Sequence, residues 1–495
     1  MSTGELVNTS PSRHTAPRRA RLLGAWAALL GACLSGCALT GPAPVAVPAA
    51  APLPAIWQAE PAAEPAAPGH QALPAAVGDE ALRADPELQA LLQRAEAANR
   101  DLVQSALRIE QARTQAGLSE LRLTPSAALN RGANRALDPP GSWPATTTRS
   151  VGASLAVGYE LDLWGRLAAL RSADAAQLRT AETDLRAARL LLRQRVVDSY
   201  WQIAAAREQG ALVQQQLEVN RELLAATRLR VQEGKLLPIE IDRAAATLQQ
   251  AEVRLADLQA DGAQQRLQLA LLLDEAPPGP QLLQPRLPGA VPALWRIDAS
   301  PATVLERRPD VQRARAQVDA ALARSQAAEA QRYPGLSFSA SLGTGGSALR
   351  DWLSNPVAAL AGNLVVPLID WRRLDLQRNA AHTELELAAL NLRETVARAL
   401  VEIETALIDG QRLQQQLDAN AARLREALAA ERVAALRLDV GAIARVDFLQ
   451  ARNARLEAEQ GRLQLQLRAW LNRGQLARAL ALGSLAKGDK FAMPA

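Results

Sequence analysis

The chain contains the same structural unit twice. Residues 228–255 and 435–462 align at one offset of 207 positions (441 minus 234), which pairs Gly234 with Gly441. Nearly the same offset relates the further pairs Trp164 and Trp371, Arg166 and Arg373, and Asp101 and Asp310. Self-similarity over such a distance indicates one supersecondary unit built twice. Any fold for this chain must therefore hold two copies of that unit.

Composition favours long helices over a large globular core. Only 3% of the 495 residues are aromatic, whereas Ala, Leu, Gln, Arg and Glu dominate. Such a mixture suits extended helices that pack through small side chains. The sequence therefore predicts a mainly α-helical protein.

Charge and motif content exclude several classes of function. Much of the net charge of +5 comes from the N-terminal leader, and no basic stripe of the kind that binds nucleic acid follows it. The three histidines, His14, His70 and His382, lie far apart and no cysteine cluster accompanies them. Phosphate-binding loops, nucleophile elbows and zinc motifs are not found in the sequence. We therefore expect neither an enzyme nor a metal or cofactor site.

The N-terminus has the features of an export signal. Three arginines between positions 18 and 21 precede the apolar run Leu22 to Leu34, which is too short to span a membrane as a helix. The run ends in Leu34-Ser35-Gly36-Cys37, which resembles the lipobox of bacterial lipoproteins. The resemblance implies that residues 1–36 are a signal peptide and that Cys37 carries S-diacylglycerol and N-acyl (palmitate) chains. A chance cysteine in an apolar leader is the alternative.

Residues 37–78 are predicted to form the lipid anchor and its tether. This segment is rich in Pro and Ala and has little apolar surface to bury, so we expect a semi-extended chain that joins the lipid to the folded body. Ala38, where other lipoproteins carry Asp, resembles a signal for sorting to the outer membrane.

Each unit is predicted to contain two β-strands. The expected strands span about 126–136 and 150–161 in the first unit and about 336–343 and 357–368 in the second. Strict alternation is clearest between 150 and 161, where one face carries Val151, Ala153, Leu155, Val157, Tyr159 and Leu161. The other face carries Ser, Gly, Ala and one Glu. An apolar face opposite a small polar face is typical of membrane β-barrel strands.

Four strands cannot close a barrel, and open sheet edges are not tolerated in lipid. Three copies of the chain would supply twelve strands, an even number compatible with outer-membrane barrels. A soluble sandwich is the alternative, but no helix set is evidently built to cover these strands.

Long helical hairpins follow the strands. Helices are expected from about Asp79, over 166–233 and 239–273 in the first unit, and over 373–438 and 444–482 in the second. The long ones would measure about 100 Å at ~1.5 Å per residue. Heptad spacing of Leu449, Leu456, Leu463 and Trp470 indicates antiparallel coiled coils. Their hairpin tips are residues 234–239 and 441–446, and the units span 79–285 and 286–485, before a tail at 486–495.

Particular motifs give the chain a family resemblance. They are Tyr159-Glu160-Leu161-Asp162-Leu163-Trp164-Gly165-Arg166, then Leu305-Glu306-Arg307-Arg308-Pro309-Asp310-Val311, then Arg332-Tyr333-Pro334 and the two glycine turns. With them the chain resembles the TolC/OprM-like outer membrane efflux proteins, in the lipoprotein subfamily that serves RND-type pumps. The resemblance implies a homotrimer in the outer membrane of a Gram-negative bacterium. Its 12-stranded β-barrel would continue into a 12-helix periplasmic α-barrel, which docks on an adaptor protein and through it on an inner-membrane pump.

The resemblance also implies a gate at the periplasmic tips. Glu240 and Asp447 each follow a turn glycine, Gly234 or Gly441, by six residues, and trimerisation would place three of each near the aperture. Gln450 stands where the family commonly has Asp, so one acidic ring is missing from the expected set. The alternative for both carboxylates is an ordinary helix N-terminal cap, which the helix dipole favours, and the two roles are compatible.

These observations favour a passive exit duct for drugs or other small molecules. A duct for secreted polypeptide would use the same fold. A lipid-anchored periplasmic coiled-coil scaffold is disfavoured because it has no use for membrane-facing strands.

Overall fold

The computed structural model describes residues 54, 56–58, 85–135, 147–277, 285–289, 297, 300–347, 356–367 and 369–482. Its helices are α3 (Pro86–Ala98), α4 (Arg100–Glu120), α5 (Arg166–Gln232), α6 (Ile239–Leu272), α7 (Pro301–Arg307), α8 (Pro309–Ala330), α9 (Trp371–Asp439) and α10 (Arg445–Ala479). The strands are β1 (Leu123–Arg135), β2 (Thr147–Leu161), β3 (Gly335–Gly346) and β4 (Pro356–Val365). The expected signal peptide, most of the tether and the tail at 486–495 lie outside the described residues. None of the described helices combines the length and hydropathy of a membrane-spanning helix.

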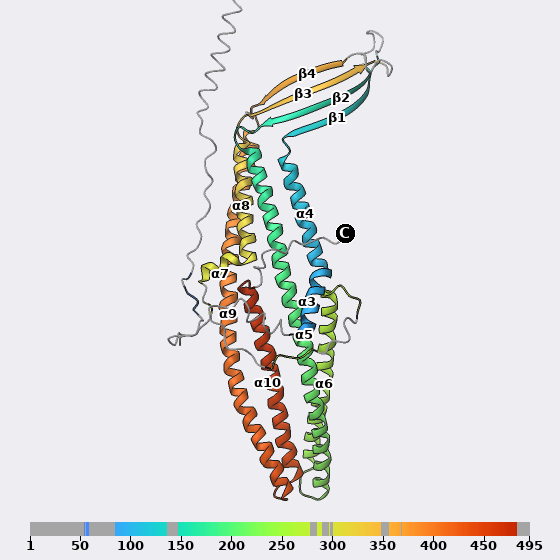
Figure 1. The fold of residues 1–495 in the computed structure, drawn as a ribbon, viewed down its shortest axis with the longest axis vertical. Coiled ribbons are helices and arrows are strands. Elements are labelled where there is room, and N and C mark those ends of the chain that lie inside the picture. The colour runs from blue at the N-terminus through green and yellow to red at the C-terminus, as the bar shows by residue number, and fades with distance from the viewer. Residues whose placement is uncertain are drawn as a thin grey trace, which may run out of the picture.

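The molecule is long, with a sheet at one end and the two hairpin tips at the other (Figure 1). Helices α5 and α9 have 67 and 69 residues, which corresponds to about 100 Å each at ~1.5 Å per residue. Helix α5 packs against α4, α6, α8 and α10, and α9 packs against α8 and α10. The expected boundary between 285 and 286 falls in the connection from α6 to α7.

The four strands form one antiparallel sheet in the order β1-β2-β3-β4, so β1 and β4 are its edges. Strands β1 to β3 begin one to three residues before the predicted starts. The predicted end of the last strand, at 368, is wrong: β4 ends at Val365. Pro367 soon follows and has no N–H to donate to a ladder.

The register brings the apolar side chains of neighbouring strands onto one face. Leu155 is paired with Ala127 on β1 and Leu342 on β3, and Tyr159 is paired with Leu123 and Phe338. This face is exposed in the single chain; for example, Leu155 and Leu342 are 61% and 56% exposed. The opposite face carries small and polar residues, since Gly158 is paired with Thr124 and Ser339. The predicted two-faced alternation is confirmed in β2 over 150–161 and in β3 over 336–343. The edge strands depart from it, since Arg131 and Arg135 lie on the apolar face and Val357 and Val365 on the small polar face.

The main core lies midway along the helices. It gathers α3, α5, α6 and α10 around Tyr200, Trp201 and Trp470, with the two indole rings 5.2 Å apart. Leu449, Leu456, Leu463 and Trp470 are all buried, as the heptad spacing predicts.

The N-terminal helical segment of each unit is broken into two helices. The sequence predicts a continuous helix from Asp79, without this break. Asn99 separates α3 from α4, and Arg308 separates α7 from α8, at the same repeat position (308 minus 99 is 209). Both side chains are buried. Asn99 Nδ2 donates to the carbonyl of Leu272 at 3.0 Å, and Arg308 Nη1 donates to that of Ala479 at 2.6 Å. Each acceptor is the last residue of its return helix, so one polar contact per unit satisfies a free helix-end carbonyl.

Candidate functional site

The hairpin tips are formed by glycines in the left-handed region. Gly234 has φ 69° and Gly441 has φ 70°. The N–H of Lys235 donates to the carbonyl of Arg230 at 2.8 Å, and the N–H of Ala442 donates to that of Arg437 at 2.8 Å. With the bonds from each glycine N–H to a carbonyl three residues back, this is a Schellman ending. The prediction that both glycines end long helices is confirmed.

The two acidic gate candidates begin the return helices. Asp447 Oδ2 accepts the backbone N–H of Ala444 at 3.0 Å, which satisfies one free donor at the start of α10. Glu240 lies in the first turn of α6 and pairs with Arg243 at 2.7 Å. The helix-cap role weighed for Asp447 is therefore observed, and its exposed carboxylate keeps a free oxygen for a second role.

Gln450 lies one helical turn beyond Asp447 and is exposed like it. Asp447 also lines an open cavity of about 460 Å³ between α9 and α10, together with Arg437 and Ile443. The tip of the second unit therefore presents both an acidic group and a groove.

Contacts between α5 and α10 hold the two hairpins together near the tips. Arg445 binds Glu222 at 2.7 Å, Asn453 Nδ2 donates to Asn220 Oδ1 at 2.6 Å, and Gln460 Nε2 donates to Gln216 Oε1 at 3.0 Å. Asn220 and Gln460 are each only 1% exposed. Sequence reasoning missed this amide ladder, because single Asn and Gln residues on helices give no periodic signal.

The motif from Tyr159 to Arg166 forms the joint between sheet and helices. Asp162 accepts the backbone N–H groups of Leu167 and Ala168 at 3.0 and 2.8 Å and so caps α5. Gly165 adopts φ 76° just before the helix. Trp164 stacks on Tyr333 at 4.8 Å, and its indole N–H donates to the carbonyl of Pro334 at 2.9 Å. The first and third motifs, far apart in sequence, therefore meet at one joint.

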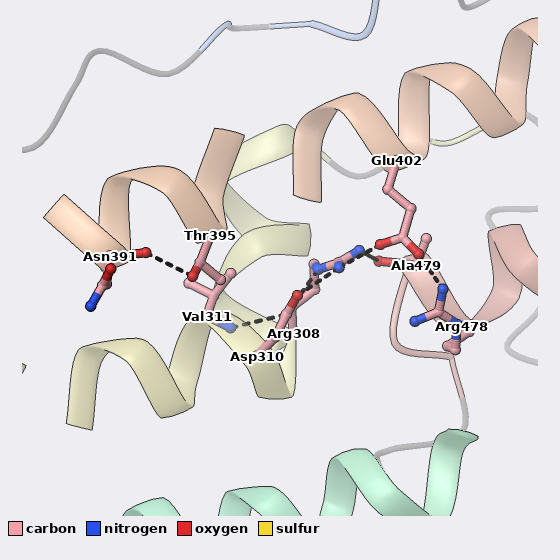
Figure 2. Close-up of polar contacts among 8 residues, drawn as sticks. All are labelled: Arg308, Asp310, Val311, Asn391, Thr395, Glu402, Arg478 and Ala479. Carbon is pink, nitrogen blue, oxygen red and sulfur yellow. Dashed lines mark hydrogen bonds and ion pairs between the residues drawn. The ribbon is translucent and has the colours of Figure 1, made fainter. Parts of the chain in front are cut away.

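The second motif centres on a buried arginine (Figure 2). Arg308 binds the Asp310 carboxylate through two contacts of 2.7 and 3.0 Å and binds Glu402 on α9 at 2.7 Å. Arg478 on α10 also contacts Glu402. The cluster thus ties α8 to α9 and α10.

The pairing shifts the pKa values of both Arg308 and Asp310. Burial alone would lower the pKa of Arg308, but its hydrogen bonds and ion pairs with Asp310 and Glu402 raise that pKa above its ordinary value. Burial would raise the pKa of Asp310, but the Arg308 guanidinium lowers it overall. Both groups therefore stay charged at neutral pH.

The pKa of Asp198 on α5 shifts in the direction opposite to that of Asp310. Burial raises the pKa of its carboxyl to about 7, although a hydrogen bond with Gln194 and the charge of Arg478 oppose the shift. The sequence gives no signal for this, because the carboxyl is removed from water by tertiary packing: it lies near Gly474 of α10 and lines a cavity with residues of α6 such as Gln268.

Part of the expected tether is docked on the helical body. Trp57 is 4% exposed and belongs to a buried apolar cluster with Ile403, Leu407 and Leu476, to which α7, α9 and α10 contribute. The N–H of Gln58 donates to Glu404 Oε1 at 2.8 Å. Its Pro/Ala-rich composition predicts only a connection, and a single tryptophan gives no pattern from which docking could be predicted. Cys37, the candidate lipidation site, lies outside the described residues.

Among the described residues, no group of His, Cys, Asp and Glu is arranged to hold a metal ion.

Comparison with known proteins gives consistent matches. A family model described as outer membrane efflux protein matches residues 91–275 and 301–482, one segment in each repeat. The pyoverdine export outer membrane protein OpmQ of Pseudomonas aeruginosa is 29% identical over 395 residues, 77% of this chain and 82% of that protein. The probable efflux pump outer membrane protein TtgC of Pseudomonas putida is 26% identical over 455 residues, 88% of this chain and 90% of that protein.

A solved structure shares the architecture. The open state of the Neisseria gonorrhoeae MtrE outer membrane channel matches with a TM-score of 0.69 at 26% sequence identity, over 80% of this chain and 89% of that one.

Proposed function

The chain belongs to the outer membrane efflux protein family, and from this premise we propose that three copies form the exit duct of a tripartite efflux pump. As a member of this family the protein is an outer-membrane efflux channel with a periplasmic helical extension.

The sheet is the observation that carries the proposal. It has an exposed apolar face, a small polar face, and two edge strands, β1 and β4, whose outer ladder groups have no partner strand in the single chain. In lipid such edges must be paired, because an unsatisfied backbone group there costs several kcal/mol. Pairing β1 of one copy with β4 of the next in three copies closes a twelve-stranded barrel. The polar face then lines a water-filled lumen.

The helices extend the lumen into the periplasm. Four helices run from the sheet, and α5 and α9 continue to the tips as hairpins with α6 and α10 (Figure 1). Three copies therefore place twelve helices around one axis. Exposed apolar residues on α9, such as Leu387 and Leu390 at 55% and 56% exposure, supply surface for contact between copies.

The tips are the proposed gate and docking end. Three copies of Asp447 and of Glu240 ring the aperture, and their negative field favours cations in the constriction. The helix-cap bond uses only one oxygen of Asp447, so the cap and the gate coexist. Because Gln450 is neutral, there is no second acidic ring one helical turn beyond that of Asp447. A periplasmic adaptor protein, linked to an RND-type pump, docks here and delivers the cargo.

Cys37 is the proposed lipid attachment site. Twenty residues separate it from Trp57, which reach about 62 Å in the polyproline conformation at ~3.1 Å per residue. From Trp371, at the sheet end of α9, to Ile403 beside Trp57 is 32 residues, or about 48 Å at ~1.5 Å per residue. The tether is therefore long enough to join a lipid at the membrane to the docked tryptophan. Cys37→Ser should abolish incorporation of radiolabelled palmitate, and unchanged labelling would refute the site.

The cargo proposed is a small molecule chosen by the pump. The decisive experiment deletes the chromosomal copy and measures susceptibility to dyes and antibiotics, with the wild-type chain and an empty vector as controls. Restored resistance together with an SDS-resistant trimer in the outer membrane supports the duct. A stable monomer, or resistance that does not depend on the chain, would reject it.

A further inference from the structure

The outward face of the barrel changes abruptly from apolar to basic toward the loop end of the sheet. Along β2 the apolar positions run from Leu161 to Val151, and the next position on that face is Arg149. Along β1 the same face runs from Leu123 to Leu129 and continues with Arg131.

The register places three arginines together on this face. Arg131 is paired with Val151, Ala133 with Arg149, and Arg135 with Thr147. Arg149 is therefore the diagonal neighbour of both Arg131 and Arg135, a separation of about 7–8 Å between backbone positions. All three residues are exposed.

Nothing else in the described strands neutralises the three charges. The only carboxylate in β1 to β4 is Glu160, which lies at the opposite end of β2 and pairs with Arg166 at 2.6 Å. No ion pair or hydrogen bond to another described residue involves the side chains of Arg131, Arg135 or Arg149. The lumen face beside them carries neutral Asn130 and Asn134. The cluster is therefore directed at the surroundings of the barrel and not at the cargo.

The height of the cluster fits the membrane surface. Ten residues from Leu161 to Val151 rise about 33 Å along the strand, which a tilt of ~40° reduces to about 25 Å, the usual thickness of the apolar band of a barrel. The helices leave the sheet at the Leu161 end (Figure 1). The arginines therefore lie at the far, extracellular side of the band.

We infer that Arg131, Arg135 and Arg149 form a binding site for a phosphate-bearing glycolipid of the outer leaflet. Arginine suits this task because its guanidinium binds phosphate oxygens in pairs and its stem packs on apolar chains. The acyl chains lie on the apolar rows headed by Val151 and Leu129 while the phosphates meet the guanidinium groups. The inference rests on the proposed barrel, which sets the outward direction of this face.

Purified, delipidated trimer is titrated with bis-phosphorylated lipid A and with the same lipid after enzymatic dephosphorylation, and bound lipid is counted by native mass spectrometry. Wild-type protein should bind the phosphorylated form at least tenfold more tightly, since each arginine near an anionic surface contributes about fivefold. Equal binding of the two forms by the wild-type trimer overturns the inference without any variant.

The variant R131Q/R135Q/R149Q should lose the preference for phosphate. The control R113Q/R221Q/R412Q removes the same charge from exposed positions on α4, α5 and α9 and should keep it. Retained preference in the first variant overturns the inference. Trimer mass and channel conductance are measured on the same samples. A wild-type protein that forms no trimer and no channel would reject the duct itself. A triple variant that forms a normal channel but has no preference for the phosphorylated lipid places the lipid site at these three arginines.

Discussion

Replacing Arg308 tests whether the buried ion cluster holds α8 against α9 and α10 in the second unit. Arg308→Met removes a side chain that is 6% exposed and makes four charge-assisted contacts: two with Asp310, one with Glu402 and one with the Ala479 carbonyl. Breaking a buried pair by removing one partner costs about 3–5 kcal/mol. Asp310 and Glu402 are about one-third exposed, so water recovers part of this cost. We expect a loss of about 3 kcal/mol per chain, at the lower end of that range.

The matched control is Arg307→Met, which removes the same charge from the adjacent, exposed position. Thermal unfolding of the detergent-solubilised protein is followed by circular dichroism at 222 nm. For a chain of this length a loss of ~3 kcal/mol lowers the midpoint by about 3 °C. If the Arg308 variant melts within about one degree of the control, the cluster does not stabilise the junction and the reasoning is wrong.

The difference in stability between the wild type and Arg308→Met should also decrease at low pH. Arg308 lowers the pKa of Asp310 below its ordinary value of 3.8. Stability from a depressed carboxyl pKa is fully present above 3.8 and is lost as pH falls through the folded value. The gap between wild type and Arg308→Met should therefore be constant from pH 6 to pH 8 and should narrow below about pH 4.

Three further outcomes are expected. Asp198→Asn should leave stability unchanged near pH 4 and raise it by about 2 kcal/mol at pH 8, because a carboxyl pKa raised from 3.8 to about 7 costs stability progressively between these two pH values and in full above pH 7; the same difference in unfolding free energy from the wild type at both pH values would contradict this. Trp57→Ala should expose the tether to limited proteolysis while Ile56→Ala, at a side chain 73% exposed, should not; equal cleavage rates would exclude docking. Asp447→Asn should reduce the cation selectivity of single channels and Gln450→Asp should increase it; unchanged reversal potentials would restrict Asp447 to its cap.

Local patterns in the sequence determined most of the fold. Helix and strand periodicities depend only on which side chains share a face, so the apolar row from Val151 to Leu161 and the heptads from Leu449 to Trp470 could be found without coordinates. The turn glycines were equally visible, because only residues that tolerate positive φ end helices in this way. Because the unit is duplicated, the pattern of each strand pair and helical hairpin occurs twice in the sequence. The family resemblance, carried by the joint motifs, supplied the function that periodicity alone left open.

Tertiary structure decided which polar groups meet. Asn99 and Arg308 sit at equivalent repeat positions but are different residue types, so nothing in the sequence marked them as the two side chains that reach the carbonyls of Leu272 and Ala479. The raised pKa of Asp198 arises from burial among helices that include α6 and α10, far along the chain. Such contacts join segments more than a hundred residues apart, and they depend on the relative rotation of packed helices, which a one-dimensional pattern does not encode.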